Sequence, residues 1–265
     1  MSSAQDLVAE LLAAFRDPAP ATGEAGGTAT GAGTPPGREL PAARPLVALG
    51  PPVRFASRER ERSPLLTVLE QRRSTRFFSP DPVDASLVAD VAARGIAADI
   101  TSWPDEQDQV PLRINVVAFR LGGLEPGMYS LDTGSSTGGG TGERSYVKVA
   151  PLPEGEALHG LTIQREFCDS AAIISLAADL DRASAVHGAH GYRTLMSRAG
   201  AAAYTMWLDA VAVGLVGSVF AGFIPASVRQ PLRSDGASRH QLFALALGGA
   251  PVLPPPKTPG PTSHR

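Results

Sequence analysis

The sequence has a single cysteine, Cys168, among its 265 residues. One thiol cannot form an intrachain disulfide, a CxxC redox pair or a thiolate zinc site, so these kinds of chemistry are excluded and no metal site is expected. Long apolar runs are also lacking, and the N-terminus has no basic segment followed by an apolar one. We therefore expect a protein of a reducing, cytoplasmic compartment that has no membrane contact.

An excess of charge of one sign is lacking as well. The 24 Lys and Arg residues nearly balance the 26 Asp and Glu residues, which gives a formal net charge of −2 and an isoelectric point near 6.2. Without a global positive field, we expect no nucleic-acid partner. Because 43% of the residues are hydrophobic, the chain can bury a sizeable core in one domain and still have tails.

The two ends differ in composition from the middle. Residues 1–17 carry apolar side chains at helical spacing and are expected to form a short amphipathic helix, which either docks on a partner or else packs back on its own domain or frays. Residues 18–60, with many Gly and Pro, are expected to be a disordered linker, and residues 254–265 a Pro-rich tail. The folded domain is placed at 61–253.

Ser63-Pro64 begins a predicted helix, with the Ser63 hydroxyl at the N-cap and Pro64 at the first helical position. The apolar side chains that follow are expected to form the buried face of this helix: Leu65, Leu66, Val68 and Leu69. The helix leads directly into the polar segment 71–78.

Later segments show both helical and strand patterns. A second helix is expected to begin at the cap residue Asp84, and a long helix rich in small residues runs from Tyr192 to Leu215, where Gly214 ends it. The Gly/Ser/Thr stretch 135–143 is expected to be a mobile loop. This order predicts an α+β fold in which helices surround a mixed or antiparallel sheet. Strands are expected at 113–121, 128–131, 146–149, 171–177, 217–220 and 241–247.

The segment 71–78, Gln-Arg-Arg-Ser-Thr-Arg-Phe-Phe, places three guanidiniums and two hydroxyls within five residues. Guanidinium forks match phosphate oxygens, and short hydroxyls fill the remaining acceptor sites. The cluster of Arg72, Arg73, Ser74 and Arg76 is therefore a candidate phosphate site. The alternative is a solvated helix end whose arginines complement the helix dipole.

A second candidate feature is the glycine-containing segment 214–223, which follows the long helix. Glycines allow the backbone to approach a flat heteroaromatic ring and to offer peptide N–H groups to its edge, as flavin sites require. The alternative is that a glycine at this place is simply a helix cap.

Taken together and in order, these motifs resemble the nitroreductase superfamily, and within it the SagB/McbC type of FMN-dependent dehydrogenases that act on ribosomally made peptides. Arg72, Ser74 and Arg76 match the family's R-x-S-x-R/K segment, and residues 123–131 are similar to its GLEPGLYxY turn. The resemblance covers roughly residues 60–253. It continues through Gly191-Tyr192-Arg193, Ala199-Gly200, 208–215, Ala221-Gly222-Phe223 and Leu247-Gly248.

The resemblance implies a nitroreductase-like, dimeric FMN-binding fold, with the cofactor held between two subunits. It implies that the FMN phosphate is bound by the arginine cluster, with a further contact from Ser102, and that Ala221 and Gly222 lie against the flavin ring. The family's peptide-tailoring members oxidise thiazolines and oxazolines to azoles, while other relatives use reduced nicotinamide to reduce substrates.

The chain also departs from the family pattern. The family's PSxGxLYPxE segment is replaced by 101–111, which contains three acids, and its DAGHxxQN helix motif by 198–205. The Lys-Tyr pair of azoline oxidases is replaced by Val186-His187. Because azoline oxidation needs a proton acceptor, the protic side chains near these motifs become the catalytic candidates: His187, His190, Tyr192 and Tyr204.

Three functions remain open from the sequence. The first is an FMN-dependent oxidoreductase that dehydrogenates azolines in a peptide. The second is a non-catalytic or half-active subunit that forms a heterodimer with a paralogous flavin dehydrogenase. The third is an NAD(P)H-dependent flavin reductase of dehydroamino acids or other activated alkenes. The partner is accordingly a second copy of this chain or a paralogue, and the substrate of the first function is a peptide.

Overall fold

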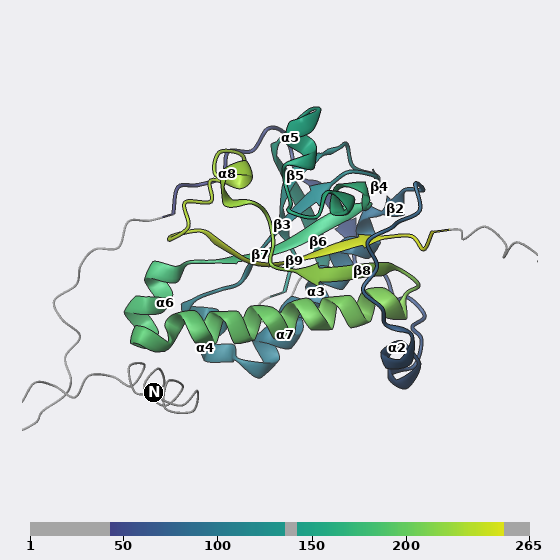
Figure 1. Cartoon of the computed structure of the whole chain (residues 1–265). Helices are drawn as coiled ribbons and strands as arrows, with labels where there is room; N and C mark the ends of the chain where they lie inside the picture. The colour runs from purple at the N-terminus through teal and green to yellow at the C-terminus, as the bar shows by residue number, and fades with distance from the viewer. Residues whose placement is uncertain (1–42, 136–141, 252–265) are drawn as a thin grey trace, which may run out of the picture.

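A seven-stranded sheet forms the centre of the molecule (Figure 1). The computed structural model describes residues 43–135 and 142–251, so the predicted helix 1–17, the tail 254–265 and most of the loop 135–143 lie outside the described residues. Every neighbouring pair in this sheet is antiparallel, and a separate two-stranded parallel sheet joins β2 (Val83–Asp84) to β4 (Leu121–Gly122). The main sheet has the order β1-β6-β5-β3-β7-β9-β8.

The main sheet contains seven strands, and seven α-helices lie within the described residues. The strands of the main sheet are β1 (Val53–Ala56), β3 (Arg113–Ala118), β5 (Gly127–Asp132), β6 (Glu143–Ala150), β7 (Ala172–Ala178), β8 (Val216–Phe220) and β9 (His240–Gly248). The α-helices are α2 (Leu65–Gln71), α3 (Ala85–Ser102), α4 (Pro104–Gln109), α5 (Glu156–His159), α6 (Leu180–His187), α7 (Gly191–Ala212) and α8 (Pro225–Val228).

The two faces of the sheet bury two separate cores. Alternating strand residues point to opposite faces, so Ile174 and Leu176 of β7 join the core under α3 and α7, while Ile173 joins the core on the other face. The long helix α7 runs along one face, and α5 and α8 lie over the other (Figure 1). This confirms the predicted α+β class with an antiparallel sheet and surrounding helices.

Helices α3 and α7 pack closely because small residues line their contact. A Cβ on Gly95 of α3 would lie 2.4 Å from the Met206 side chain and 2.8 Å from the Ala202 carbonyl oxygen, both of α7. Arg198 of α7 is fully buried and forms a 2.8 Å ion pair with Asp99 of α3. Arg198, part of the altered family motif, therefore has a structural role that joins the two helices.

The predicted helix ends are confirmed for α3 and α7. The Asp84 carboxylate accepts a 2.8 Å hydrogen bond from the Ser86 backbone N–H and caps α3. Helix α7 ends at Ala212, and Gly214 follows with a φ of 84° that L side chains rarely adopt. In the part of the chain that the structure describes, no helix is long and apolar enough to cross a membrane.

The boundary of the folded domain differs from the prediction. Strand β1 lies inside the range 18–60 that was expected to be linker, and it pairs with β6 over the whole length Val53–Ala56. Val53 and Phe55 alternate with Arg54, but Ala56 ends the alternation after three residues, which is too short a run to predict a strand. The domain therefore begins before residue 61.

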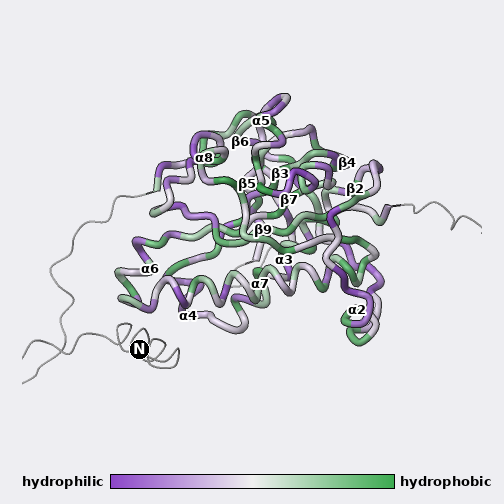
Figure 2. Tube along the Cα trace, viewed as in Figure 1, coloured by the Kyte–Doolittle hydropathy of each residue, from purple (hydrophilic) through white to green (hydrophobic). Residues whose placement is uncertain are grey.

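The predicted buried face of α2 is wrong. Only Val68 of the four apolar residues is buried, whereas Leu65, Leu66 and Leu69 are 62%, 75% and 42% exposed. The N-cap is Pro64, and no side chain, including that of Ser63, caps this helix. Figure 2 shows hydrophobic stretches in α2, which projects from the edge of the domain. The helix contacts α7 on one side and leaves an apolar face in solvent.

Candidate functional site

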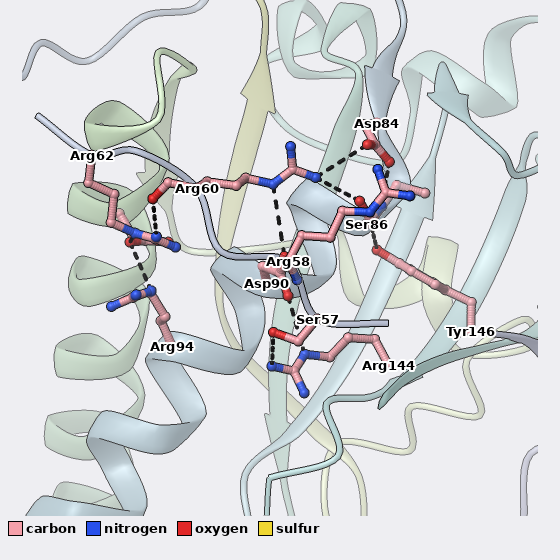
Figure 3. Close-up of polar contacts among 12 residues, drawn as sticks. Ser57, Arg58, Arg60, Arg62, Asp84, Ser86, Asp90, Arg94, Arg144 and Tyr146 are labelled. Carbon is pink, nitrogen blue, oxygen red and sulfur yellow. Dashed lines mark hydrogen bonds and ion pairs between the residues drawn. The ribbon is translucent and has the colours of Figure 1, made fainter. Parts of the chain in front are cut away.

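A strap of chain, residues 57–62, is fastened to the domain before α2 begins (Figure 3). The buried carboxylate of Asp90 on α3 accepts a 3.3 Å hydrogen bond from the Arg58 backbone N–H. Two guanidiniums face the same carboxylate, Arg60 at 3.9 Å and Arg144 at 3.6 Å. Arg60 also pairs with Asp84 at 3.2 Å. One buried acid on α3 thus holds the first half of the strap.

A second buried acid holds the other half of the strap. Asp209 of α7, with a side chain 8% exposed, pairs with Arg62 at 2.7 Å and with Arg94 of α3 at 3.2 Å. The Ser63 backbone N–H donates to the Ala212 carbonyl oxygen at 2.9 Å. These contacts fix where α2 starts, and therefore where the arginine cluster after α2 lies.

Arg72, the first residue of the cluster, lies over two aromatic rings of α7. Its guanidinium carbon is 4.5 Å from the centroid of Trp207 and 5.7 Å from that of Tyr204. Stacking of this kind stabilises a cation and keeps its in-plane N–H donors free for other partners. The Arg72 Nε is buried and has no hydrogen-bond partner among the described residues. The stacking therefore holds the Arg72 guanidinium in one orientation, with N–H donors available to a ligand.

The middle of the cluster lies against the start of β8. Ser74 forms an isolated parallel bridge with Gly217, and the Thr75 backbone N–H donates to the Gly217 carbonyl oxygen at 3.1 Å. A Cβ on Gly217 would lie 2.2 Å from the Ala246 carbonyl oxygen of β9, so this position has room for glycine alone. Segment 74–75 is in this way held as an extension of the sheet edge.

The guanidiniums of this cluster have no carboxylate partner within residues 43–135 and 142–251. Arg73 donates to the carbonyl oxygens of Glu70 and Arg72 at 2.7 and 2.8 Å. Arg73 and Thr75 line a pocket of about 330 Å³ beside Gly214, and Arg76 lines another of about 360 Å³. The cluster retains its positive charge.

A larger pocket, of about 490 Å³, lies at the other end of β8. It brings together Tyr192 at the start of α7 and Ala221, which follows β8. Next to Ala221, Gly222 has a φ of 105°, and a Cβ there would meet no atom within 4 Å. The polar side chains of the lining are Tyr192, Arg229, Ser234, Asp235, His240 and Gln241. We call this the Ala221 pocket.

One strand links the arginine cluster to the Ala221 pocket. Gly217, which contacts Ser74, and Ala221 are four residues apart along β8 and its end. At about 3.3 Å per residue, their separation is roughly 13 Å. Helix α7 runs beside this strand, with Tyr192 near the pocket and Trp207 near the arginines. The two candidate regions therefore lie at the two ends of β8.

Three of the candidate residues predicted from the sequence do not line the Ala221 pocket. Tyr204, 41% exposed, lies beside Arg72 and is about 18 Å along α7 from Tyr192. His187 ends α6, and its Nε2 is buried with no hydrogen-bond partner in the described part of the chain. Ser102 is exposed at the end of α3. The structure does not gather these three residues at the Ala221 pocket.

The acids of segment 101–111 lie on α4, away from the arginine cluster. The Glu106 carbonyl oxygen accepts a 3.2 Å hydrogen bond from Arg198, near the middle of α7. Trp103 and Glu106 line a separate pocket with His190 and Arg193. Within one chain these acids therefore do not face the candidate phosphate site.

Two residues of the site escaped the sequence analysis. Trp207 supports Arg72, and its spacing from Tyr204 on α7 was a usable signal, since residues three apart share a helix face. His240 lines the Ala221 pocket but opens β9 without any motif around it. Only the folding of β9 beside β8 brings His240 to this pocket.

Cysteine and metal chemistry find no support at this site. Cys168 is buried, and its thiol donates to the Leu158 carbonyl oxygen at 3.2 Å. Burial, and then the nearby negative charge of Asp169, raise the pKa of this thiol, which keeps it protonated at neutral pH. Among the residues that the structure describes, no three His, Cys, Asp or Glu side chains gather as a metal site would require.

Comparison with solved structures identifies the fold. A protein assigned as a nitroreductase from Anabaena variabilis is 22% identical, with a TM-score of 0.55 over 71% of this chain and 38% of that one. A protein assigned as a nitroreductase from Ralstonia eutropha is 15% identical, with a TM-score of 0.54 over 81% of this chain and 97% of that one. No protein-family model and no curated protein matches the sequence. The chain has a nitroreductase-like fold.

This chain thus spans well under half the length of the Anabaena protein and nearly the whole length of the Ralstonia protein. The predicted nitroreductase-like architecture is confirmed. The likeness concerns the fold, and the arrangement of residues around β8 carries the functional argument.

Proposed function

We propose that this protein is an FMN-dependent oxidoreductase. The observation that carries the proposal is the pairing of two complementary regions along β8. At one end, Arg72 and Arg76 present guanidiniums that form no ion pair with a carboxylate among the described residues, and the Ser74 hydroxyl lies between them in the sequence, as a phosphate site requires. At the other end, Ala221 and Gly222 leave room beside the backbone for a flat ring. FMN has a phosphate at one end and a flat ring at the other, so its two ends match the two ends of β8.

The residues present suit this cofactor in detail. The buried Nε of Arg72 has no hydrogen-bond partner in the part of the chain that the structure describes, and the guanidinium stacks on Trp207 of α7. Arg73 lines a pocket of about 330 Å³, and Arg76 lines a separate pocket of about 360 Å³. The phosphate would be bound by this cluster, and the flavin ring would lie against Ala221 and Gly222. Ser102 would require a second subunit to join such a site, since in its own chain it lies apart.

The reaction we favour is dehydrogenation of a thiazoline or oxazoline in a peptide to the azole. In this reaction the substrate loses a hydride and a proton; FMN, when bound, would supply the hydride acceptor, with molecular oxygen as the final oxidant. The protein must supply the base. His240 and Tyr192 are the protic side chains that line the Ala221 pocket, and imidazole has the proton affinity suited to this role near neutral pH. His240 is therefore our first candidate and Tyr192 the second.

A partner subunit is part of this proposal. Leu65, Leu66 and Leu69 of α2 and the 69%-exposed Phe77 place apolar side chains in solvent directly before and within the arginine segment. Burial of such side chains favours association. The partner is a second copy of this chain or a paralogous flavin dehydrogenase subunit; in the heterodimer, this chain would be the half-active member.

A direct test measures FMN in the purified full chain. We expect near-stoichiometric flavin in the visible spectrum, and a marked loss of flavin in Arg72→Ala/Arg76→Ala, because charge-assisted bonds to the phosphate disappear. Arg165→Ala is the control, since the ion pair of Arg165 within residues 43–135 and 142–251 is with the exposed Glu156. Unchanged flavin in the double variant would refute the phosphate assignment.

The alternatives differ in how flavin is acquired and reduced. Flavin that binds only after mixing with a paralogous chain would favour the half-active subunit over the homodimeric enzyme. Bleaching of the bound flavin by NADPH under nitrogen would favour the reductase of dehydroamino acids or other activated alkenes over the azoline oxidase. Rapid reoxidation in air without NADPH bleaching would favour the oxidase.

A further inference from the structure

A second positively charged concavity lies beside the Ala221 pocket. It has a volume of about 550 Å³ and is lined by Arg44, Arg229, Gln230, Arg233 and Asp235. Arg229 and Asp235 also line the Ala221 pocket, so the two concavities share a wall. We call this concavity the Arg229 pocket. It lies at the end of β8 away from the Arg72 cluster, and none of its residues belongs to a motif of the sequence.

The arginines of this pocket lack carboxylate partners. Arg44, Arg229 and Arg233 are exposed, and none forms an ion pair within residues 43–135 and 142–251. The single acid of the lining, Asp235, is engaged locally. Its carboxylate accepts hydrogen bonds from the Ser238 hydroxyl and from the backbone N–H groups of Ala237 and Arg239, both at 2.9 Å. Positive charge therefore exceeds negative charge here.

A buried arginine adds to this imbalance. Arg239 is 5% exposed, and its guanidinium donates to the carbonyl oxygens of Arg44 at 3.2 Å and Leu232 at 3.3 Å. It thereby ties together the two segments that form the pocket wall. Burial, followed by the positive charges of Arg113 and Arg233, lowers the pKa of Arg239. Bringing these like charges together is unfavourable, and a bound anion would relieve the repulsion.

The backbone of the pocket wall is itself unusual. Arg233 has a φ of 48°, and it is the one non-glycine residue with positive φ in the described part of the chain. Such a conformation is strained, and it persists only where the surrounding structure holds the residue in place. It turns the chain between Leu232 and Ser234, so that Arg233 lines the pocket while both neighbours are buried.

We propose that the Arg229 pocket binds oxyanions, the phosphate or carboxylate groups of a ligand that extends into the Ala221 pocket. Three guanidinium forks around a space of this size suit two or more such groups better than one. The shared wall at Arg229 places the rest of the ligand beside Tyr192 and His240. The proposal concerns binding alone, and it holds whether or not the Ala221 pocket takes a flavin.

Calorimetric titration of the purified full chain with two probes tests this inference. Pyrophosphate represents a diphosphate source, and triglutamate represents an acidic peptide. We expect saturable binding of at least one probe that weakens with salt. Binding should fall about tenfold or more for each arginine removed in Arg229→Ala/Arg233→Ala. The probe that binds more tightly shows whether the oxyanions of the ligand belong to a diphosphate or to an acidic peptide. Absence of saturable binding of both probes would refute the proposal.

Two controls make the result specific. Arg165→Ala removes one exposed positive charge outside the pocket, and it should leave both titrations unchanged; an equal loss in this variant would show that binding is merely electrostatic and would overturn the site. Arg229→Lys/Arg233→Lys keeps the charge but removes the forks, so partial loss is expected. Should the Ala double variant fail to fold, Arg44→Ala, in an exposed loop, must show the same about tenfold loss.

Discussion

The two ends of β8 differ in how much of their chemistry the local sequence contains. At the arginine end, five consecutive residues supply the guanidiniums and hydroxyls, and α7 adds only the rings beneath Arg72. At the other end, the Ala221 pocket draws residues from α7, β9 and the turns around α8. A phosphate-type site can thus be built from one segment, whereas a pocket for reacting groups is assembled by the fold.

The largest expected effect separates catalysis from cofactor retention. If His240 is the base, His240→Gln should lower turnover of an azoline peptide by about 10²–10⁴-fold, because no other group would take the proton as readily. Flavin content should not change, since His240 lies away from the arginine cluster. Steady-state kinetics with flavin absorbance measures both quantities.

Tyr192→Phe is the companion variant, which keeps the ring and removes the hydroxyl. A large loss in this variant with little loss in His240→Gln would transfer the role of base to Tyr192. Loss of flavin in either variant would contradict the separation of cofactor retention, at the arginine cluster, from catalysis, at the Ala221 pocket.

Replacing Gly217, which lies in β8 between the two candidate regions, should destabilise the whole domain. A Cβ at Gly217 would lie 2.2 Å from the Ala246 carbonyl oxygen, so Gly217→Ala should lower the free energy of unfolding by about 1–3 kcal/mol through overpacking. Chemical denaturation measures the loss. Gly50→Ala is the control, because a Cβ there meets nothing within 4 Å; equal stability of the two variants would contradict the close approach of β8 and β9.

A smaller effect is expected from loosening the strap. Asp209→Asn removes the charge that holds Arg62 and Arg94, at 2.7 and 3.2 Å, and should cost about 1–2 kcal/mol of stability. Because the strap positions α2, FMN affinity should fall as well, while oxyanion binding at the Arg229 pocket should not. Denaturation and ligand titration measure these changes. Equal weakening at both pockets would show that the strap does not act on one end alone.

Acid should produce the smallest effect. Partial burial raises the pKa of Asp84 and of Asp235, but hydrogen bonds outweigh it and leave both pKa values below the ordinary 3.8. The unfolded chain therefore binds these protons first, so the stabilisation is complete above about pH 4 and is lost as the pH falls through the lower folded-state values. Unfolding curves from pH 5 down to pH 2 measure it. Asp84→Asn and Asp235→Asn should each flatten this decline, and an unchanged slope would contradict the assignment.

The sequence predicted what depends on local pattern. Asp84 as the α3 cap, Gly214 as the end of α7 and the run of apolar strands follow from neighbouring residues, and the structure confirms them. The resemblance to the nitroreductases then supplied an architecture that local pattern alone leaves open. Strand β1 was not predicted because the alternation of Val53, Arg54 and Phe55 is too short to identify a strand, and its pairing with β6 is a long-range event.

The candidate site was predictable to a lesser degree. Leu65, Leu66 and Leu69 have helical spacing, but spacing does not tell whether a face packs within the chain or on a partner. His240 has no motif, and it reaches the Ala221 pocket only because β9 pairs with β8. His187 and Tyr192 are close in sequence, yet only Tyr192 lines that pocket.

The measurement that tests the central claim most directly is the flavin content of the purified full chain, compared with that of Arg72→Ala/Arg76→Ala and of Arg165→Ala. The account predicts near-stoichiometric FMN in the unsubstituted chain and in Arg165→Ala, and little in the double variant. A colourless chain that does not take up added FMN, alone or with a paralogous partner, would contradict it, as would a double variant that keeps its full flavin.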